Sequence, residues 1–147
     1  MAKGPSTLRI VALLCVLVMA SACSGEEPPA PRATSIAIDA FLSSESTLEP
    51  PPEGTSQVLI DASAHPPQLT VTLWGSTSCP AFPTAIEWAN SSTLEITMRA
   101  PDGSQGCTAD LSPYSHVIVL PEGGDASSVK FARIADERIP VAFQEDQ

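Results

Sequence analysis

The strongest constraint on the fold is a two-residue alternation of apolar and polar side chains, which recurs through most of the chain after residue 54. Within residues 68–74, Leu69, Val71 and Leu73 share one face, and threonines alternate with them on the other. This period is typical of a β-strand with one buried face, whereas an amphipathic helix repeats every three to four residues. After residue 22, no stretch of ten residues combines helical periodicity with capping residues. The chain is therefore predicted to fold from strands.

Further segments carry the same alternation, and proline, glycine, serine and asparagine separate them at intervals of about ten residues. The turn residues 89–92 predict a hairpin between residues 86–88 and 94–98, and residues 135–138 predict a second one. Short strands at this spacing are typical of a small antiparallel β-sandwich, either immunoglobulin-like or a small barrel. The remaining predicted strands are residues 57–60, 116–120, 129–133 and 139–143.

The first 22 residues have the pattern of an export signal. Lys3 and Arg9 are their only charged residues, and residues 10–20 are almost wholly apolar. A helix of that apolar length spans roughly 16 Å, about half of the ~30 Å hydrocarbon core of a bilayer. We therefore expect a cleaved signal peptide rather than a permanent transmembrane anchor.

Cys23 follows three small residues, Ala20, Ser21 and Ala22. A small residue directly before a cysteine is similar to the lipobox of bacterial lipoproteins, in which the cysteine is acylated on its sulfur. The lipobox usually has leucine or valine where this chain has Ala20. Ordinary signal peptidase can cut the same bond, so the alternative is a secreted protein without lipid.

The number of cysteines supports lipid on Cys23. Cys15 lies in the apolar segment and leaves with the signal peptide. A lipidated Cys23 then leaves Cys79 and Cys107 as a pair, whereas a free Cys23 would leave an odd thiol in an oxidising compartment. We therefore predict lipidation of Cys23 and a structural disulfide bond between Cys79 and Cys107.

Three consecutive prolines at residues 50–52 interrupt regular structure and separate a short apolar piece from the main body. Residues 24–33 have no apolar period, and such a Pro-rich segment would extend roughly 31 Å at ~3.1 Å per residue. The sequence therefore predicts three parts. Residues 1–22 are a lipoprotein signal peptide, and residues 54–147 are a β-sandwich domain. Between them, residues 23–53 contain the lipidated cysteine and a Pro/Ser/Glu-rich tether, which includes a short strand within residues 34–42.

The charge balance of the exported part excludes one class of partner. After residue 22, five basic residues remain against all 17 acidic ones, which gives a formal charge of minus 12. Such a surface repels phosphate backbones, so no nucleic-acid partner is expected. The cysteines and the two separated histidines do not have zinc-ligand spacing, so neither a metal nor a cofactor is expected.

The sequence also lacks the usual signatures of catalysis. His65 precedes two prolines and is predicted to lie in an exposed loop, while His116 is predicted to lie in a strand. No Gly-x-Ser-x-Gly elbow is present to place a nucleophilic serine beside a base. The chain is therefore predicted to be non-enzymatic.

Three residues are candidates for ligand binding. Trp74 can stack on a sugar or a peptide, and the hydroxyls of Ser76 and Ser78 can form hydrogen bonds with a ligand. The alternative is that Trp74 belongs to the core and that the serines satisfy the backbone of a turn. Trp88 shares a strand face with Ile86 and is expected in the core.

Two segments carry a resemblance to known sequences. The first reads Trp-Gly-Ser-Thr-Ser-Cys-Pro at residues 74–80, and the second reads Cys-Thr-Ala-Asp-Leu-Ser-Pro at residues 107–113. Together with residues 117–121, they resemble a group of small actinobacterial lipoproteins without an established activity. The resemblance covers residues 68–121 and implies export, lipidation and pairing of Cys79 with Cys107. It transfers no catalytic or binding residue.

These patterns lead to one functional hypothesis and one alternative. The chain is expected to be held on the outer face of the cell membrane by lipid on Cys23. There it would act as a binding or structural module of the cell envelope, with an envelope protein or a glycan as its partner. The alternative is a small secreted hydrolase or hydrolase inhibitor, whose site residues would be brought together only by folding.

Overall fold

The computed structural model describes residues 34–102 and 106–144, and the predicted signal peptide, Cys23 and residues 24–33 lie outside this part. Two 3-10 turns, Ser43–Glu45 and Ala126–Ser128, accompany the strands. None of the described residues form a helix that is long and apolar enough to cross a membrane. The all-β prediction is confirmed by eight strands, which are β1 (Asp39–Leu42), β2 (Gln57–Asp61), β3 (Gln68–Gly75), β4 (Phe82–Asn90), β5 (Thr93–Arg99), β6 (Ser112–Val119), β7 (Phe131–Ile134) and β8 (Glu137–Phe143).

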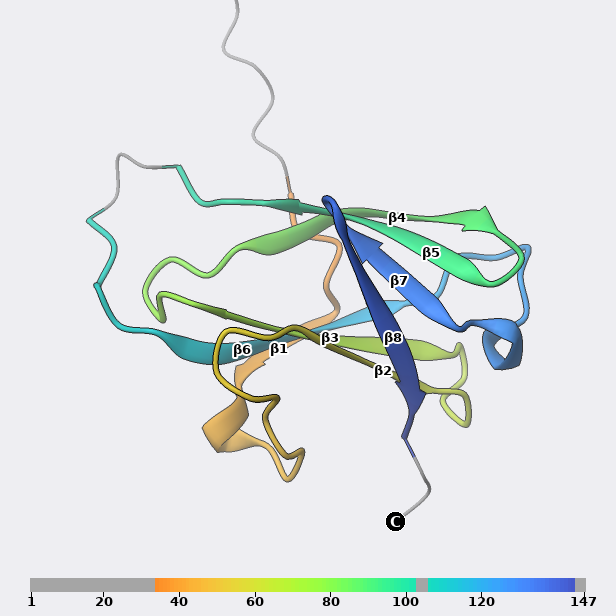
Figure 1. Cartoon of the computed structure of the whole chain (residues 1–147), viewed down its shortest axis with the longest axis horizontal. Helices are drawn as coiled ribbons and strands as arrows, with labels where there is room; N and C mark the ends of the chain where they lie inside the picture. The colour runs from red at the N-terminus through yellow and green to blue at the C-terminus, as the bar shows by residue number, and fades with distance from the viewer. Residues whose placement is uncertain (1–33, 103–105, 145–147) are drawn as a thin grey trace, which may run out of the picture. The chain divides into compact units, whose positions relative to one another are not determined.

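The strands form two layers that are joined into one curled sheet in the order β1-β6-β3-β2-β8-β7-β5-β4 (Figure 1). The joining element is β8. Residues 137–140 pair with β7, and residues 141–143 pair with β2 in the other layer. The predicted sandwich is thus closed along this edge by a single strand that changes layer.

Two of the strand pairs run parallel, although the sequence analysis predicted an antiparallel fold. These pairs are β2 with β8 and β5 with β7. The strands of each pair are far apart in the chain, and β6 lies between β5 and β7 in the sequence but in the other layer. Such long connections allow parallel pairing, which a tight hairpin turn does not.

The opposite edge is closed by the segment that leads into β1. The Ile36 amide donates to the Pro83 carbonyl on β4 at 2.9 Å, whereas the Ile38 amide donates to the Val117 carbonyl on β6 at 2.8 Å. From Asp39 onward, β1 pairs antiparallel with β6. This segment therefore also changes layer.

The predicted domain boundary at residue 54 is wrong, because the compact unit spans Arg32–Gln147. The short strand that the sequence predicted within residues 34–42 is present as β1, and it completes the edge of β6. Ser43 follows it and is buried, with its hydroxyl 3.5 Å from the Ser115 hydroxyl. The proline-rich residues 50–52 therefore lie inside the folded unit rather than in a tether.

The core fills the space between the two layers. Cross-strand partners share a face, so Leu69 and Val71 of β3 face inward together with Ile118 of β6. The other layer contributes Leu94 and Ile96 of β5 and Ala132 of β7. The fully buried aliphatic residues include Val58, Ile60, Leu69, Val71, Leu94, Ile96, Ile118 and Ala132.

Trp88 packs against this core, as the sequence predicted, and its indole is fixed by two contacts. Its Nε1 donates to the Pro121 carbonyl at 3.0 Å. Its ring also lies against Gly124 so closely that a Cβ atom there would overlap the ring carbons. Gly124 is therefore required by the packing of Trp88.

Replacing Gly124 with alanine is expected to destabilise the fold by about 1–3 kcal/mol, because the added methyl group overlaps the Trp88 ring, which its hydrogen bond to Pro121 and its packing against the core hold in place. Urea unfolding followed by tryptophan fluorescence measures the loss. Gly75→Ala is the matched control, since a Cβ there meets no atom within 4 Å. Equal midpoints for the two variants would contradict this packing.

Cys79 and Cys107 form the predicted disulfide bond, with their Cα atoms 5.4 Å apart and 28 residues of sequence separation. The bond joins the loop before β4 to the loop after β5. It therefore closes the base of the β4–β5 hairpin. Closure of a loop of this length restricts the unfolded chain and stabilises the fold by up to about 3.6 kcal/mol.

The double variant Cys79→Ala/Cys107→Ala is expected to unfold at a lower urea concentration than the wild type, because its unfolded chain is no longer cross-linked. Reduction of the wild-type protein should lower its midpoint by a similar amount, which controls for the substitutions themselves. A double variant that unfolds at the wild-type midpoint, or free thiols at both positions in the native exported protein, would show that the bond is not structural.

Candidate functional site

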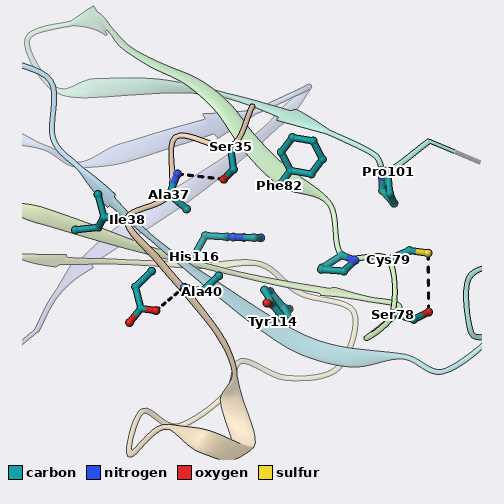
Figure 2. A pocket seen from close by; sticks show the side chains of 12 residues that line it. Ser35, Ala37, Ile38, Ala40, Ser78, Cys79, Phe82, Pro101, Tyr114 and His116 are labelled. Atoms are coloured by element: carbon teal, nitrogen blue, oxygen red, sulfur yellow. Dashed lines mark hydrogen bonds between the residues drawn. The ribbon is translucent and has the colours of Figure 1, made fainter. Parts of the chain in front are cut away.

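Two cavities lie beside the disulfide bond. The larger has a volume of about 480 Å³ and is walled by the segment leading into β1, by Phe82 and by the inner face of β6 (Figure 2). The smaller has a volume of about 220 Å³ and extends along the end of β3. Both cavities share Cys79, Pro80, Pro101 and Tyr114 as wall residues, so they are neighbours across one partition.

The space is open because the residues around it are short or rigid. Alanine and proline line both cavities, at Ala37 and Ala40 in the larger one and at Ala81 and Ala100 in the smaller one. In the core, the corresponding space is filled by leucine, isoleucine and the indole of Trp88. The short side chains on these walls therefore leave open pockets between the two layers.

His116 is the most distinctive residue of the larger cavity. It pairs with Val71 of the core and with Ala40 of β1, so its side chain faces inward, and it is only 3% exposed. Its Nε2 lies 2.7 Å from the Ala81 carbonyl oxygen. A carbonyl can only accept, so Nε2 carries the proton and Nδ1 is an acceptor. That Nδ1 is buried and has no hydrogen-bond partner.

Burial lowers the pKa of His116 below its ordinary value of 6.5, and the hydrogen bond to the Ala81 carbonyl offsets part of this effect. The imidazole is therefore neutral at pH 7. Tyr114, two residues earlier on β6, lies beside it with ring centroids 5.1 Å apart. The larger cavity thus combines apolar walls with one buried, uncharged acceptor.

Trp74 lines the smaller cavity and carries the second unusual atom. Its Nε1 is buried and has no hydrogen-bond partner. Within residues 34–102 and 106–144, this atom and Nδ1 of His116 are the buried side-chain nitrogen or oxygen atoms without a partner. His116 faces inward with Tyr114, whereas Trp74 alternates with Leu73 and so lies on the other face of β3, with Thr72. On that face, the buried Thr72 and Ser115 hydroxyls bond each other at 2.8 Å.

The two candidate serines lie in a network of hydroxyls near the disulfide bond. The Thr108 hydroxyl lies 2.9 Å from that of Ser76 and 3.0 Å from that of Ser78, and the Thr108 amide donates to Ser78 at 2.9 Å. Asp110 accepts hydrogen bonds from the Thr108 hydroxyl and from Thr77, which lower the pKa of its carboxyl. The network therefore ties together the same two loops as the disulfide bond.

The structure thus brings Trp74 and Ser78 to the walls of the paired cavities, while Ser76 contacts Ser78 without lining either cavity. The binding role of all three stays a prediction. Sequence reasoning missed Tyr114 and placed His116 in a strand without assigning it a function. The sequence did contain one signal for His116, because this histidine alternates with the aliphatic residues Ile118 and Leu120 and so shares their strand face.

Several polar groups near the cavities and His65 are engaged in local hydrogen bonds. Asp39 lines the larger cavity with His116, but its carboxylate accepts a hydrogen bond from the Ala40 amide at 2.8 Å. The Ser35 hydroxyl accepts from the Ala37 amide at 3.1 Å. His65 is exposed, with Nδ1 2.6 Å from the Ser63 carbonyl. In the described ranges, no three metal-ligating side chains cluster in a way that could hold an ion.

The chain matches no protein-family model, and no match to a curated protein or to a solved structure was found. The function of the paired cavities is therefore inferred from their own geometry.

The pKa of His116 in the folded protein is lower than the ordinary 6.5 that applies to the unfolded chain. The neutral imidazole therefore contributes its full stability above pH 6.5, and this contribution is lost as the pH falls from 6.5 through the pKa of the folded state. The urea midpoint of the wild type should therefore fall between about pH 7 and about pH 5. In His116→Phe, which cannot titrate, this part of the profile should be flat.

The carboxyl pKa values of Asp61, Asp110 and Asp125 are lowered from the ordinary 3.8, so these groups change the stability of the fold only below about pH 5. They therefore contribute little between about pH 7 and about pH 5. A wild-type profile that stays level from neutral pH down to about pH 5 would contradict a buried neutral imidazole.

Proposed function

We propose that this chain is a lipid-anchored protein on the outer face of the cell membrane and that it acts as a non-enzymatic binding module. The observation that carries the binding function is the position of His116 in the wall of the larger cavity, with a buried acceptor, Nδ1, that lacks a partner. Concave apolar spaces with a few convergent polar groups are the usual form of small-molecule sites.

The energetics of that polar atom support this reading. A buried donor or acceptor without a partner costs about 1–3 kcal/mol. Elsewhere the fold satisfies such groups, as in the bond from Trp88 Nε1 to the Pro121 carbonyl. A ligand that donates a hydrogen bond to His116 would recover part of this cost, and the gain would appear as affinity.

The hydrolase alternative has less support from the described residues. A hydrolytic site of the serine type requires a nucleophile that is hydrogen-bonded to a base. The Nε2 of His116 is bonded to the Ala81 carbonyl, and the hydroxyls of Ser35 and Ser78 are engaged with backbone amides. These contacts favour binding over proton transfer.

The expectation that the protein does not bind nucleic acid has support from the basic residues. Of the four in the described part, Arg133 pairs with Glu95, and Arg138 stacks over the Phe131 ring at 3.5 Å. Few cations are thus available to contact phosphate groups, while acidic side chains are numerous.

The membrane anchor rests on the sequence features before residue 24, which are the charged start, the short apolar segment and the small residues before Cys23. Residues 24–33 would then connect the lipid to the compact unit at Arg32–Gln147. Because Ser35 and Ala37 line the larger cavity, the chain leads almost directly from this tether into the wall of the proposed site.

Replacing Cys23 with serine is expected to abolish lipidation, since serine offers no thiol for the acyl transfer. The wild-type protein should partition into the detergent phase, and its N-terminal peptide should carry the mass of a lipidated cysteine. Cys15→Ser is the matched control and should leave both properties unchanged. A Cys23→Ser protein that is fully processed and still membrane-bound would refute the anchor.

A further inference from the structure

We propose that the paired cavities bind an uncharged, mainly apolar small molecule that donates a hydrogen bond to Nδ1 of His116. This inference rests on the binding function proposed above and specifies the chemistry of its ligand.

The donor requirement follows from His116. Its Nε2–H is already committed to the Ala81 carbonyl at 2.7 Å, which leaves Nδ1 with a free lone pair in a buried position. Figure 2 shows the imidazole of His116 among the wall residues, between Ala37 and Phe82 on one side and Tyr114 on the other. A ligand hydroxyl or N–H group is the complement of that lone pair.

The absence of charge follows from the other wall residues. No lysine or arginine lines either cavity, and Asp39 is the one charged wall residue of the larger cavity. An anionic ligand would lose its hydration without meeting a cation, and it would also approach a carboxylate. A neutral ligand avoids both costs.

The apolar character follows from the aromatic, proline and disulfide surfaces. Phe82, Pro80, Pro101 and the sulfur of Cys79 present few hydrogen-bonding groups. A glycan that entered this space would leave most of its hydroxyls without partners. The volume of about 480 Å³ lies in the range of small-molecule sites, so we favour a compact apolar ligand over a glycan or a protein partner.

Access to Nδ1 requires a local movement, because this atom is closed off from solvent in the ligand-free structure. The adjacent side chain is Tyr114, whose ring is inclined by 52° to the imidazole and also belongs to the partition between the cavities. Rotation of this ring opens Nδ1 to the ligand and joins the two spaces.

The test uses three probes with one carbon skeleton and the exported Cys23→Ser protein with its disulfide bond formed, so that no detergent competes. N-Phenyl-1-naphthylamine is neutral and has an N–H donor. 8-Anilino-1-naphthalenesulfonate adds a negative charge, and 1-benzylnaphthalene replaces the N–H with a methylene group. Binding is measured by fluorescence titration, and the third probe is measured by displacement.

The neutral amine is expected to bind with one-to-one stoichiometry. The methylene analogue should bind about fivefold to tenfold more weakly, since it lacks the hydrogen bond, and the sulfonate at least about tenfold more weakly. In His116→Phe, the neutral amine and the methylene analogue should bind equally. Ala37→Trp should abolish binding by filling the larger cavity.

Phe143→Ser is the matched control, because Phe143 is an exposed aromatic residue outside both cavities, and its loss should change nothing. Each variant is first checked for its β-sheet circular dichroism spectrum and for the disulfide bond. If His116→Phe does not fold, nuclear Overhauser effects from the bound amine to the rings of Tyr114 and Phe82 in otherwise unaltered protein provide the evidence instead.

Two different failures can be distinguished. Tighter binding of the sulfonate, or equal binding of the amine and its methylene analogue to protein with His116 intact, would overturn the ligand class while leaving a binding site in place. Failure of all three probes to bind, or binding that Ala37→Trp does not reduce, would overturn the ligand class and would also remove the main support for the proposed binding function.

Discussion

The structure depends on backbone hydrogen bonding at the two edges where its layers meet. On one edge, β8 pairs first with β7 and then with β2, so a single strand belongs to both layers. On the other edge, Ile36 bonds to β4 and Ile38 bonds to β6. Exposed strand edges favour association with other chains, and both crossings cover edges that would otherwise be open. They also hold the layers together independently of the side chains between them.

The paired cavities are a consequence of this arrangement. Where leucine, isoleucine and Trp88 lie between the layers, the interior is close-packed. Where alanine and proline lie between them, the crossing segments, the Cys79–Cys107 bond and the hydroxyl network around Thr108 maintain the separation. The fold therefore tolerates two unsatisfied polar atoms beside its most constrained loops. The scaffold thus holds the walls of the site, while access to His116 Nδ1 requires a local movement of Tyr114.

Much of this fold was predictable because its signals are local. The alternation in residues 68–74 and the turn after Trp88 correspond to β3 and to the β4–β5 hairpin. The parity of the cysteines predicted the bond between Cys79 and Cys107. The parallel pairs were missed, since they join strands that are distant in the chain and have no turn between them to mark the pairing. The proline cluster at 50–52 concealed that β1 belongs to the domain.

The site was predictable only in part. Trp74 and Ser78 were singled out for their chemistry, and they lie at the cavity walls. The state of His116, however, depends on the Ala81 carbonyl, which is 35 residues away in sequence and reaches it only through the stacking of the layers. No local pattern reports such a contact, or shows that the second ring nitrogen is left without one.

The most direct test of this account is the protonation state of His116 in the ligand-free protein, measured by long-range proton–nitrogen correlation on the ¹⁵N-labelled Cys23→Ser chain. His116 is expected to be neutral at neutral pH with its proton on Nε2, and its Nδ1 resonance should be typical of a nitrogen outside any hydrogen bond. A proton on Nδ1, or an imidazolium with both nitrogens protonated, would contradict it.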